Sequence, residues 1–356
     1  MILIIANART KGGLSGSDNI YLHLAEAIKK EIPKLLLDNL NGKGGYLIPQ
    51  YLLDNVKVWE MLDTDFRPFV LCYIWKIIKG CWQALWDNTH YEYVYSASDF
   101  WMDSLPAIIL KMKGNKWVAG CYMKAPKKNI FYYITQQPIL FLMNHFADVI
   151  CVTTSDVFGF KKPTVPVHGG VDMALAYPGK EAKIYDAVFV GRLHYTKGID
   201  ELIQIWETVV QNLPDAHLVI IGDGDTEAKK IKHWASISHN ITYKGYMGKE
   251  RFDVYRKSKM VLYPTPYKHS HFSMGPVEAM ACGCPMVSFD LDVMEVEKIK
   301  GARLCTDIND FVKGVIWLIK HQAIREAFSE NAINYARSWD WSVKAPMILK
   351  EIKEKL

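Results

Sequence analysis

The sequence predicts an α/β protein with two doubly wound domains, each built on a parallel sheet. The apolar strand ILIIAN (2–7) leads into the Gly/Ser-rich loop TKGGLSGSD (10–18) and the helically spaced IYLHLAEAIKKEI (20–32). A strand, a glycine loop and a helix in this order open a doubly wound unit. The same order restarts at DAVFVGRL (186–193), which is followed by IDELIQIWETVVQNL (199–213). Because the alternation begins twice, the sequence predicts two similar domains.

Short strands and helices continue this alternation along the chain. Further strands are expected at YVYSASD (93–99), KWVAGCYM (116–123), DVICVTT (148–154), AHLVIIGDGD (216–225), KMVLYPT (259–265) and PMVSFD (285–290). Further helices are expected at PAIILKMK (106–113), YYITQQPILFLMNHFA (132–147) and SWDWSVKAPMILKEI (338–352). The Gly- and Pro-rich segment 168–183 is the expected linker. We therefore expect one domain at 1–170, a second at 171–337 and a terminal helical segment at 338–356.

The bulk composition is that of an ordinary globular protein. The chain has 356 residues and a net charge of +5, which is too weakly basic to indicate a nucleic-acid partner. Seven cysteines include no Cys-x-x-Cys pair, and Cys282 and Cys284 stand too close for a usual disulfide or zinc site. A reducing, cytoplasmic compartment is therefore expected. The apolar start of the chain is too short for a signal peptide and is expected to form the first strand.

The run FVLCYIWKIIKGCWQALW (69–86) comes nearest to a membrane span. A span needs roughly 18 apolar residues without charge, whereas Lys76 and Lys79 interrupt this run. Its composition fits a core helix of the first domain, and it also fits a helix that lies in a membrane interface. The sequence leaves both alternatives open.

The stretch between Asp103 and Asp148 is basic and aromatic. It holds six lysines and no acidic residue, with several aromatic side chains among the lysines. Such a surface suits an anionic membrane or a lipid-phosphate group, although ordinary solvated lysines give the same pattern. Residues 106–133 and 69–86 are therefore the expected segments for any peripheral membrane contact.

Two cations follow the first strand of the second domain. In VFVGRLHYTKGIDELI (188–203), the strand delivers Arg192 into a loop, and Lys197 precedes the next helix. Two cations on such a turn can converge on one anion, and the helix N-terminus adds free N–H groups and its dipole. The pattern predicts a phosphate or diphosphate site, with two solvated surface cations as the alternative.

The next strand ends in a second glycine loop, IIGDGD (220–225). Gly222 permits a ligand to approach the backbone closely at the carboxyl end of the strand. Asp223 and Asp225 carry the oxygen ligands that divalent metals use, but such pairs also occur elsewhere in the chain, and no metal site is expected. The third glycine of a dinucleotide fingerprint is missing, which disfavours an oxidoreductase that uses NAD.

The stretch HSHFSMGPVEAMACGCP (269–285) holds one formal charge, Glu278. This residue stands in the first turn of a predicted short helix, where a carboxylate gains from the helix dipole. A carboxylate among small and apolar residues is costly to leave unpaired. Glu278 is therefore either a plain helix-start charge or an acceptor of hydrogen bonds from sugar hydroxyls.

Taken together, VGRLHYTKGIDELI, LVIIGDG and GPVEAMACGCPMV resemble the motifs of glycosyltransferase family 4, in order and in spacing. The resemblance is dense over residues 186–290. In the first half, GGLSGSDNIYLHLAEAI is similar to the family's glycine loop and first helix, and HGGVD resembles the entry to the second domain. The family consists of retaining, nucleotide-sugar-dependent enzymes with the GT-B fold. In that fold two Rossmann-like domains face each other across a cleft, and the C-terminal helix crosses back to the first domain.

The resemblance implies roles for the matched residues. Arg192 and Lys197 are expected to act catalytically, because they hold the donor diphosphate and stabilise the leaving group. Glu278 is expected to accept the ribose hydroxyls of the donor. Further donor contacts are expected from Gly13, Gly16, Gly222, Ser270, Met274 and Gly275. A UDP- or GDP-sugar is the implied donor, no cofactor or metal is required, and the acceptor binds the first domain.

Two positions depart from the family pattern. The family usually carries a second acid eight positions before the one matched by Glu278, and here that position is Ser270, which leaves the donor sugar open. The family often has a histidine after the strand matched by KWVAGCYM (116–123), and none stands there in this sequence. Asp99 is the expected substitute, as a catalytic group that faces the cleft.

The sequence therefore predicts a hexosyltransferase that moves a sugar, with retention, from a nucleotide diphosphate to the hydroxyl of a glycan or lipid-linked acceptor. It is expected in the cytoplasm, with association at the inner face of the cell membrane as a further expectation. A non-catalytic relative that binds nucleotide sugars is the alternative, because two common polar positions are lost.

Overall fold

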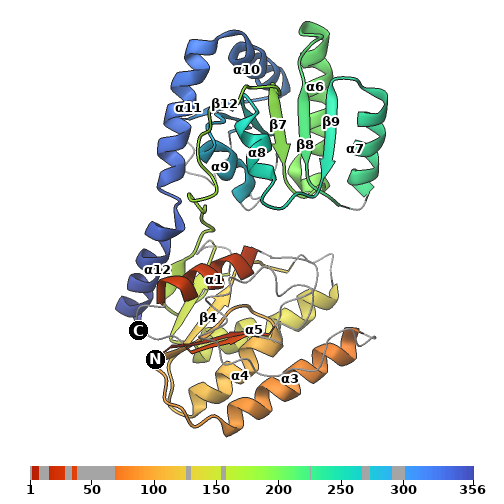
Figure 1. The fold of residues 1–356 in the computed structure, drawn as a ribbon. Helices are drawn as coiled ribbons and strands as arrows, with labels where there is room; N and C mark the ends of the chain where they lie inside the picture. The colour runs from red at the N-terminus through yellow and green to blue at the C-terminus, as the bar shows by residue number, and fades with distance from the viewer. Residues whose placement is uncertain are drawn as a thin grey trace. The chain divides into compact units, whose positions relative to one another are not determined.

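The computed structural model describes residues 2–7, 16–28, 34–37, 69–125, 130–153, 158–224, 226–266, 273–290 and 301–356. These residues form two compact units, each with a parallel sheet of its own (Figure 1). Unit 1 comprises Met1–Gly169 and Ser342–Leu356, and unit 2 comprises Gly170–Trp341. The predicted fold class, two doubly wound parallel-sheet α/β domains, is confirmed.

The strands of unit 1 lie in the order β2-β1-β3-β4-β5-β6, and every neighbouring pair is parallel. The strands are β1 (Ile2–Ala6), β2 (Lys34–Leu37), β3 (Tyr93–Ser96), β4 (Trp117–Cys121), β5 (Val149–Val152) and β6 (Thr164–Pro166). The helices are α1 (Gly16–Ile28), α3 (Phe69–Trp86), α4 (Trp101–Met112), α5 (Ile130–Phe146) and α12 (Trp341–Lys355). In Figure 1, α1 lies on one face of this sheet, and α3 and α4, which pack together, lie on the other. Because both faces are covered, β1, β3, β4 and β5 are buried along their whole length.

The helix expected at 106–113 begins five residues earlier, at Trp101, so that Pro106 lies inside α4. A proline cannot donate a hydrogen bond to the carbonyl four positions before it. The carbonyl of Met102 is satisfied instead by the side-chain amide of Asn7, which donates to it at 3.0 Å. A tertiary contact from the end of β1 therefore makes the proline tolerable.

The strands of unit 2 lie in the order β12-β11-β10-β7-β8-β9, again in parallel pairs. They are β7 (Ala187–Val190), β8 (Leu218–Ile221), β9 (Ile241–Gly245), β10 (Val261–Tyr263), β11 (Met286–Phe289) and β12 (Ala302–Cys305). The helices are α6 (Ile199–Asn212), α7 (Thr226–Ile237), α8 (Arg251–Arg256), α9 (Met274–Ala281), α10 (Ile308–Lys320) and α11 (Gln322–Arg337), with a 3₁₀ turn at Tyr195–Lys197.

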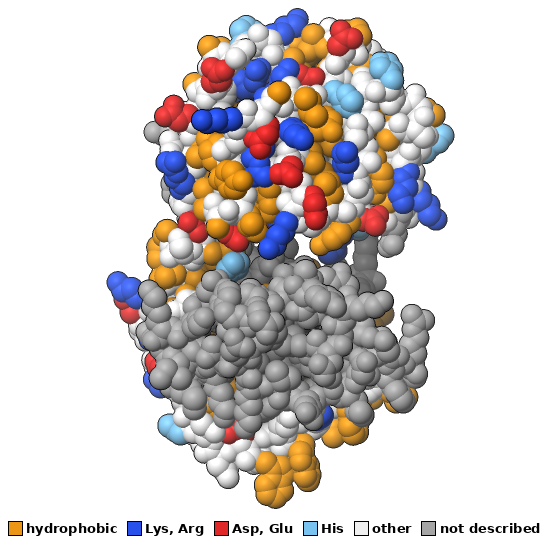
Figure 2. Space-filling model, viewed as in Figure 1, with side chains coloured by type: hydrophobic (Ala, Val, Ile, Leu, Met, Phe, Trp, Pro, Cys, Tyr) orange, Lys and Arg blue, Asp and Glu red, His pale blue; other side chains and the backbone are white. Residues whose placement is uncertain are grey.

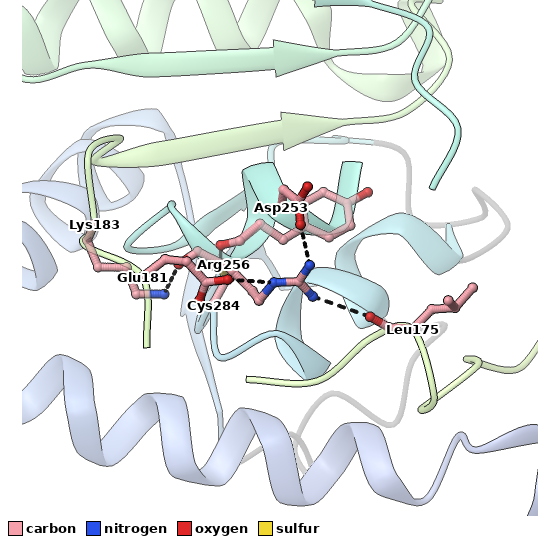
Figure 3. Close-up of polar contacts among 7 residues, drawn as sticks. Leu175, Glu181, Lys183, Asp253, Arg256 and Cys284 are labelled. Carbon is pink, nitrogen blue, oxygen red and sulfur yellow. Dashed lines mark hydrogen bonds and ion pairs between the residues drawn. The ribbon is translucent and has the colours of Figure 1, made fainter. Parts of the chain in front are cut away.

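Most of the expected linker, 168–183, is packed onto unit 2 (Figure 3). The buried guanidinium of Arg256, at the end of α8, donates to Glu181 at 3.0 Å and to the Leu175 carbonyl at 3.4 Å. Lys183 donates to the Arg256 carbonyl at 2.8 Å. The ring of Tyr177 lies under the same guanidinium, at 4.5 Å. These contacts explain why the boundary between the units falls at Gly169 and Gly170 rather than later in the segment.

The chain enters and leaves unit 2 at neighbouring positions. The Val171 N–H donates to the Trp339 carbonyl at 2.8 Å, and the Trp341 N–H donates to the Val171 carbonyl at 3.1 Å. Gly170 is required here, because a Cβ on it would lie 2.6 Å from the Trp341 ring. From Ser342 onward the chain belongs to unit 1.

Candidate functional site

Three loops meet by direct backbone contact at the carboxyl edge of the unit 2 sheet. A Cβ on Gly198 would lie 2.1 Å from the Pro264 carbonyl oxygen, and one on Gly222 would lie 1.9 Å from the Gly191 carbonyl oxygen. Both glycines also have positive φ, +73° and +150°. The loops after β7, β8 and β10 can therefore stack without side chains between them. The Gly191 carbonyl occupies the position where a Gly222 side chain would project, and a contact of Gly222 with the donor stays a prediction.

The loop after β7 carries both Arg192 and Lys197. Arg192 is exposed and Lys197 is half-buried. Burial, together with the positive charge of Arg192, lowers the pKa of Lys197. A cation such as Lys197, whose charge is disfavoured by burial and by a neighbouring positive charge, is stabilised by an anion that binds beside it. The structure thus brings these two predicted residues together, and their contact with a diphosphate remains a prediction.

The turn that carries Lys197 is fixed by hydrogen bonds. The hydroxyl of the buried Thr265, which follows β10, donates to the Thr196 carbonyl at 2.7 Å. The Gly198 N–H donates to the Tyr195 carbonyl at 3.1 Å, and α6 begins at the next residue. Because the turn is bonded at both ends, Lys197 projects from a rigid support.

The start of α9 lies against the end of β7. A Cβ on Gly275 would lie 3.0 Å from a methyl group of Val190, the last residue of β7. Met274 and Gly275 are the first residues of α9, and their N–H groups have no partner within the helix. The geometry therefore places helix-start N–H groups next to the loop of Arg192.

Glu278 has a partner that the sequence analysis did not name. Arg251, on α8, donates from Nε to Oε2 and from Nη2 to Oε1 of Glu278, each at 2.8 Å. The carboxylate is 16% exposed and the guanidinium side chain 26%. An acid that stands alone in an uncharged stretch indicates that a cation from another segment pairs with it. Its position in the sequence does not identify that cation as Arg251. Glu278 is thus neither unpaired nor a plain surface charge.

Asp99 lies in unit 1, at the carboxyl end of β3, and is buried. Its Oδ2 accepts a hydrogen bond from Nε2 of Gln136 at 2.6 Å, and the same Nε2 donates to the Met123 carbonyl at 2.8 Å. Burial raises the pKa of Asp99 above its usual value. The Gln136 amide on α5 therefore connects the Asp99 carboxylate to the chain that follows β4, and a catalytic role for Asp99 stays a prediction.

The remaining predicted residues are less defined. Gly13 and Ser270 lie outside the described residues, and Gly16 is the first residue of α1. Asp223 accepts a hydrogen bond from the Gly224 N–H at 2.9 Å. Among the described residues, no group of His, Cys, Asp and Glu side chains is arranged to hold a metal ion.

A cavity of about 670 Å³ opens elsewhere in unit 2, beside the ends of β11 and β12. Its lining includes Glu201, Asp290 and Asp307. Three acidic side chains repel a diphosphate, so this cavity is not the candidate site.

Comparison with solved structures identifies the architecture. Sucrose-phosphate synthase from Thermosynechococcus elongatus superposes with a TM-score of 0.74, at 16% sequence identity, over 99% of this chain and 98% of that chain. The chain has the GT-B fold. At this identity the likeness establishes the fold alone.

Sequence comparison relates the GT-B chain to glycosyltransferases. Residues 185–321, from just before β7 to the end of α10, match the family described as Glycosyl transferases group 1. A poly(glycerol-phosphate) alpha-glucosyltransferase of Bacillus subtilis (strain 168) is 26% identical over 194 residues, which cover 48% of this chain and 27% of that protein. A phosphatidyl-myo-inositol mannosyltransferase of Mycobacterium leprae (strain TN) is 26% identical over 168 residues, which cover 46% of this chain and 45% of that protein. The match therefore spans less than half the length of either relative.

Proposed function

We propose that this protein is a retaining glycosyltransferase that moves a sugar from a nucleotide diphosphate donor to a hydroxyl acceptor. One observation carries the proposal: Arg192 and Lys197 stand on the same loop after β7, and the start of α9, with its free-ended N–H groups, packs against the last residue of β7. Such a cluster of cations and N–H groups fits a diphosphate leaving group. The match of residues 185–321 to Glycosyl transferases group 1 covers the same elements and supports the proposal.

In the proposed reaction the donor lies on unit 2. Arg192 and Lys197 balance the charge that develops on the departing diphosphate. Glu278 accepts hydrogen bonds from the ribose hydroxyls, and the N–H groups of Met274 and Gly275 donate hydrogen bonds to the donor phosphate and sugar. Retention follows from attack on the face that the diphosphate leaves, with a phosphate oxygen taking the acceptor's proton. The protein then supplies positioning and electrostatics, and the donor is a UDP- or GDP-sugar that needs no further cofactor.

The donor site is tested by thermal unfolding with UDP, GDP, ADP and their common sugar conjugates. One nucleotide series is expected to raise the melting temperature, because a ligand present at a concentration of 100 times its Kd stabilises the native state by about 2.7 kcal/mol. Glu278→Ala is expected to lose most of that shift. If no nucleotide at millimolar concentration moves the wild-type transition, the donor proposal is wrong.

The acceptor is proposed to bind unit 1, at a lipid surface on the inner face of the cell membrane. The two relatives carry in their names a poly(glycerol-phosphate) and a phosphatidyl-myo-inositol, which both contain phosphate. An acceptor of that kind is anionic and, in the second case, lipid-borne. Its use by this chain is a proposal that rests on these likenesses and on the surface of α3.

The outer face of α3 is apolar and exposed. Its exposed side chains are Val70, Leu71, Ile74, Trp75, Ile78, Trp82, Leu85 and Trp86. Figure 2 shows hydrophobic side chains along the lower edge of unit 1, over this helix. Lys76 points inward, is buried and donates to the Asn7 carbonyl at 3.0 Å. The helix is therefore a core element on one face, and we propose its other face as a membrane surface.

Three lysines of residues 106–133 contribute less to this surface than the sequence indicated, while Lys127 and Lys128 lie outside the described residues. Lys111 pairs with Asp148 at 2.7 Å, and Lys113 donates to carbonyls at the end of α3, including that of Leu85 at 2.9 Å. Lys116 donates to the carbonyl of Leu356 at 2.6 Å. Lysines that are engaged in this way attract an anionic membrane less than free ones, so apolar insertion by α3 is the stronger part of the proposal. Among the described residues, no helix combines the length and hydrophobicity of a membrane span.

A non-catalytic nucleotide-sugar-binding protein is the second candidate. The burial of Asp99 and its bond to Gln136 favour it, because a buried carboxylate held by an amide is poorly placed to meet an acceptor. This candidate predicts the thermal shift described above without sugar transfer or donor hydrolysis.

A further inference from the structure

A neighbouring helix holds the carboxylate of Glu278 in a fixed plane. The Arg251 fork contacts both carboxylate oxygens at 2.8 Å, and its Nη1 donates to the Gly248 carbonyl at 2.7 Å. The guanidinium also lies 4.5 Å from the ring centroid of the buried Phe252. A planar fork that is bonded on three nitrogens and stacked on a ring has one orientation, and it imposes that orientation on Glu278.

Arg251 is also the charge partner of Glu278. Burial by itself lowers the pKa of Arg251, but the hydrogen bonds and the charge of Glu278 offset this and raise that pKa above its usual value. Burial, with a further contribution from Glu278, raises the pKa of the nearby Tyr255 well above its usual value. Tyr255 is therefore a neutral phenol near pH 7, and Arg251 carries the compensating charge.

The fork leaves acceptor capacity on both carboxylate oxygens. An ionised carboxylate has about four lone-pair sites, and a bidentate arginine uses one on each oxygen. The two remaining sites lie on the sides turned away from the guanidinium. A ribose presents two neighbouring hydroxyls, each of which can donate to one of these sites.

We propose that Arg251 is a positioning residue for nucleotide binding, which aims Glu278 at the ribose hydroxyls of a nucleoside diphosphate. This inference rests on the proposed function, in which Glu278 binds the ribose. Without the fork, the Glu278 side chain can rotate and its charge loses its partner. Affinity for the ribose then falls, while the diphosphate contacts of Arg192 and Lys197 remain.

The test measures how strongly the protein distinguishes a ribonucleotide from its dideoxy form. Isothermal titration with UDP, GDP and ADP identifies the base, and the 2′,3′-dideoxy form of the tightest ligand is then titrated. Wild type is expected to prefer the ribo form by roughly ten- to hundredfold, as for hydrogen bonds to a charged group. Arg251→Gln and Glu278→Gln are each expected to bring this ratio close to one, and the double variant to lower it no further. Arg251→Lys, which keeps the charge but not the planar fork, is expected to give a ratio between those of wild type and Arg251→Gln.

Arg303→Gln is the matched control. Arg303 pairs with Asp310 at 2.6 Å in the same unit, with side chains that are 35% and 26% exposed, and it has no part in the proposed site. This variant is expected to keep the wild-type ratio. A thermal melt without ligand checks the fold of each variant, and Arg251→Lys decides the test if Arg251→Gln does not fold.

The outcomes separate the two proposals. If Glu278→Gln no longer distinguishes the ribo from the dideoxy form but the Arg251 variants still do, Arg251 has only a structural role, as an ion pair between α8 and α9. If wild type binds a nucleotide but does not distinguish the dideoxy form, the inference is wrong and the donor site stands. If wild type binds no nucleotide, the proposed function fails and the inference fails with it.

Discussion

Three charged side chains that bear on the predictions take their partners from distant segments. Glu278 is held by Arg251, 27 positions earlier, and Asp99 by Gln136, 37 positions later. Lys76 reaches the carbonyl of Asn7, 69 positions away. The sequence singled out each of these residues, but it did not name their partners. Packing brings the partners together, and no local spacing encodes that step.

Asp99 gives a prediction with a definite pH dependence. Its pKa is raised in the folded protein, chiefly by burial, so its contribution to stability is present below pH 3.8 and is lost as pH rises through the folded pKa. Asp99→Asn, which can still accept the bond from Gln136, is therefore expected to melt above wild type near pH 7. The two melting temperatures are expected to converge toward pH 4. A melting temperature for Asp99→Asn that is below wild type at both pH values would contradict this account.

The strands that the sequence predicted and the strands that it missed occupy different places in the sheets. The predicted strands all lie inside the sheets, where continuous apolar runs reflect burial on both faces. The missed strands, β2, β6, β9 and β12, are the four sheet edges in the described part of the chain. In β6, β9 and β12 buried positions are mixed with more exposed ones, so their sequences lack an apolar run. An edge strand has a neighbouring strand on one side only and is therefore less buried, so its sequence carries a weaker apolar signal than that of a central strand.

The glycine-packed loops predict a contrast between two alanine substitutions. Gly222→Ala would place a methyl group 1.9 Å from a backbone oxygen at a positive φ, and is expected to lower the free energy of unfolding by about 2 kcal/mol or more. Gly314→Ala lies within α10, where the nearest atom is a flexible Arg303 side-chain carbon at 3.2 Å. That change is expected to stay within about 1 kcal/mol of wild type. Urea unfolding of both variants measures the difference, and equal effects would show that the loop contact does not constrain Gly222.

At the scale of the whole molecule, each unit completes its own core, while the surface of unit 1 carries a large apolar face. An exposed apolar face of this size is unusual in a soluble monomer, and it typically marks a surface that contacts a partner or a lipid. The α3 face includes three tryptophans, which favour the interface between lipid and water. This surface is a property of the folded protein, because it depends on which side of α3 packs against α4.

The α3 surface predicts binding to lipid vesicles. Wild type is expected to sediment with vesicles that contain phosphatidylglycerol, and to be partly released by high salt. The double variant Trp82→Ser/Trp86→Ser removes two side chains that are 62% and 70% exposed, and is expected to reduce retention several-fold. Ile237→Ser, at a residue of unit 2 that is 69% exposed, is the control and is expected to behave as wild type.

Two results would each overturn one part of the membrane proposal. Equal retention of wild type on neutral phosphatidylcholine and on anionic vesicles would exclude a preference for an anionic surface. Unchanged retention of the double tryptophan variant would exclude α3 as the contact, whatever the lipid.

The sequence by itself determined the two doubly wound domains, their central strands and the loop with Arg192 and Lys197. These features follow from local causes, because apolar runs mark buried strands and glycines mark tight loops. The tertiary structure decided what each special residue touches: Arg251 on Glu278, the Gly191 carbonyl on Gly222, and Gln136 on Asp99. It also decided that Lys76 points inward, which leaves an apolar face on α3. Those contacts join residues that are far apart in the chain, so only folding creates them.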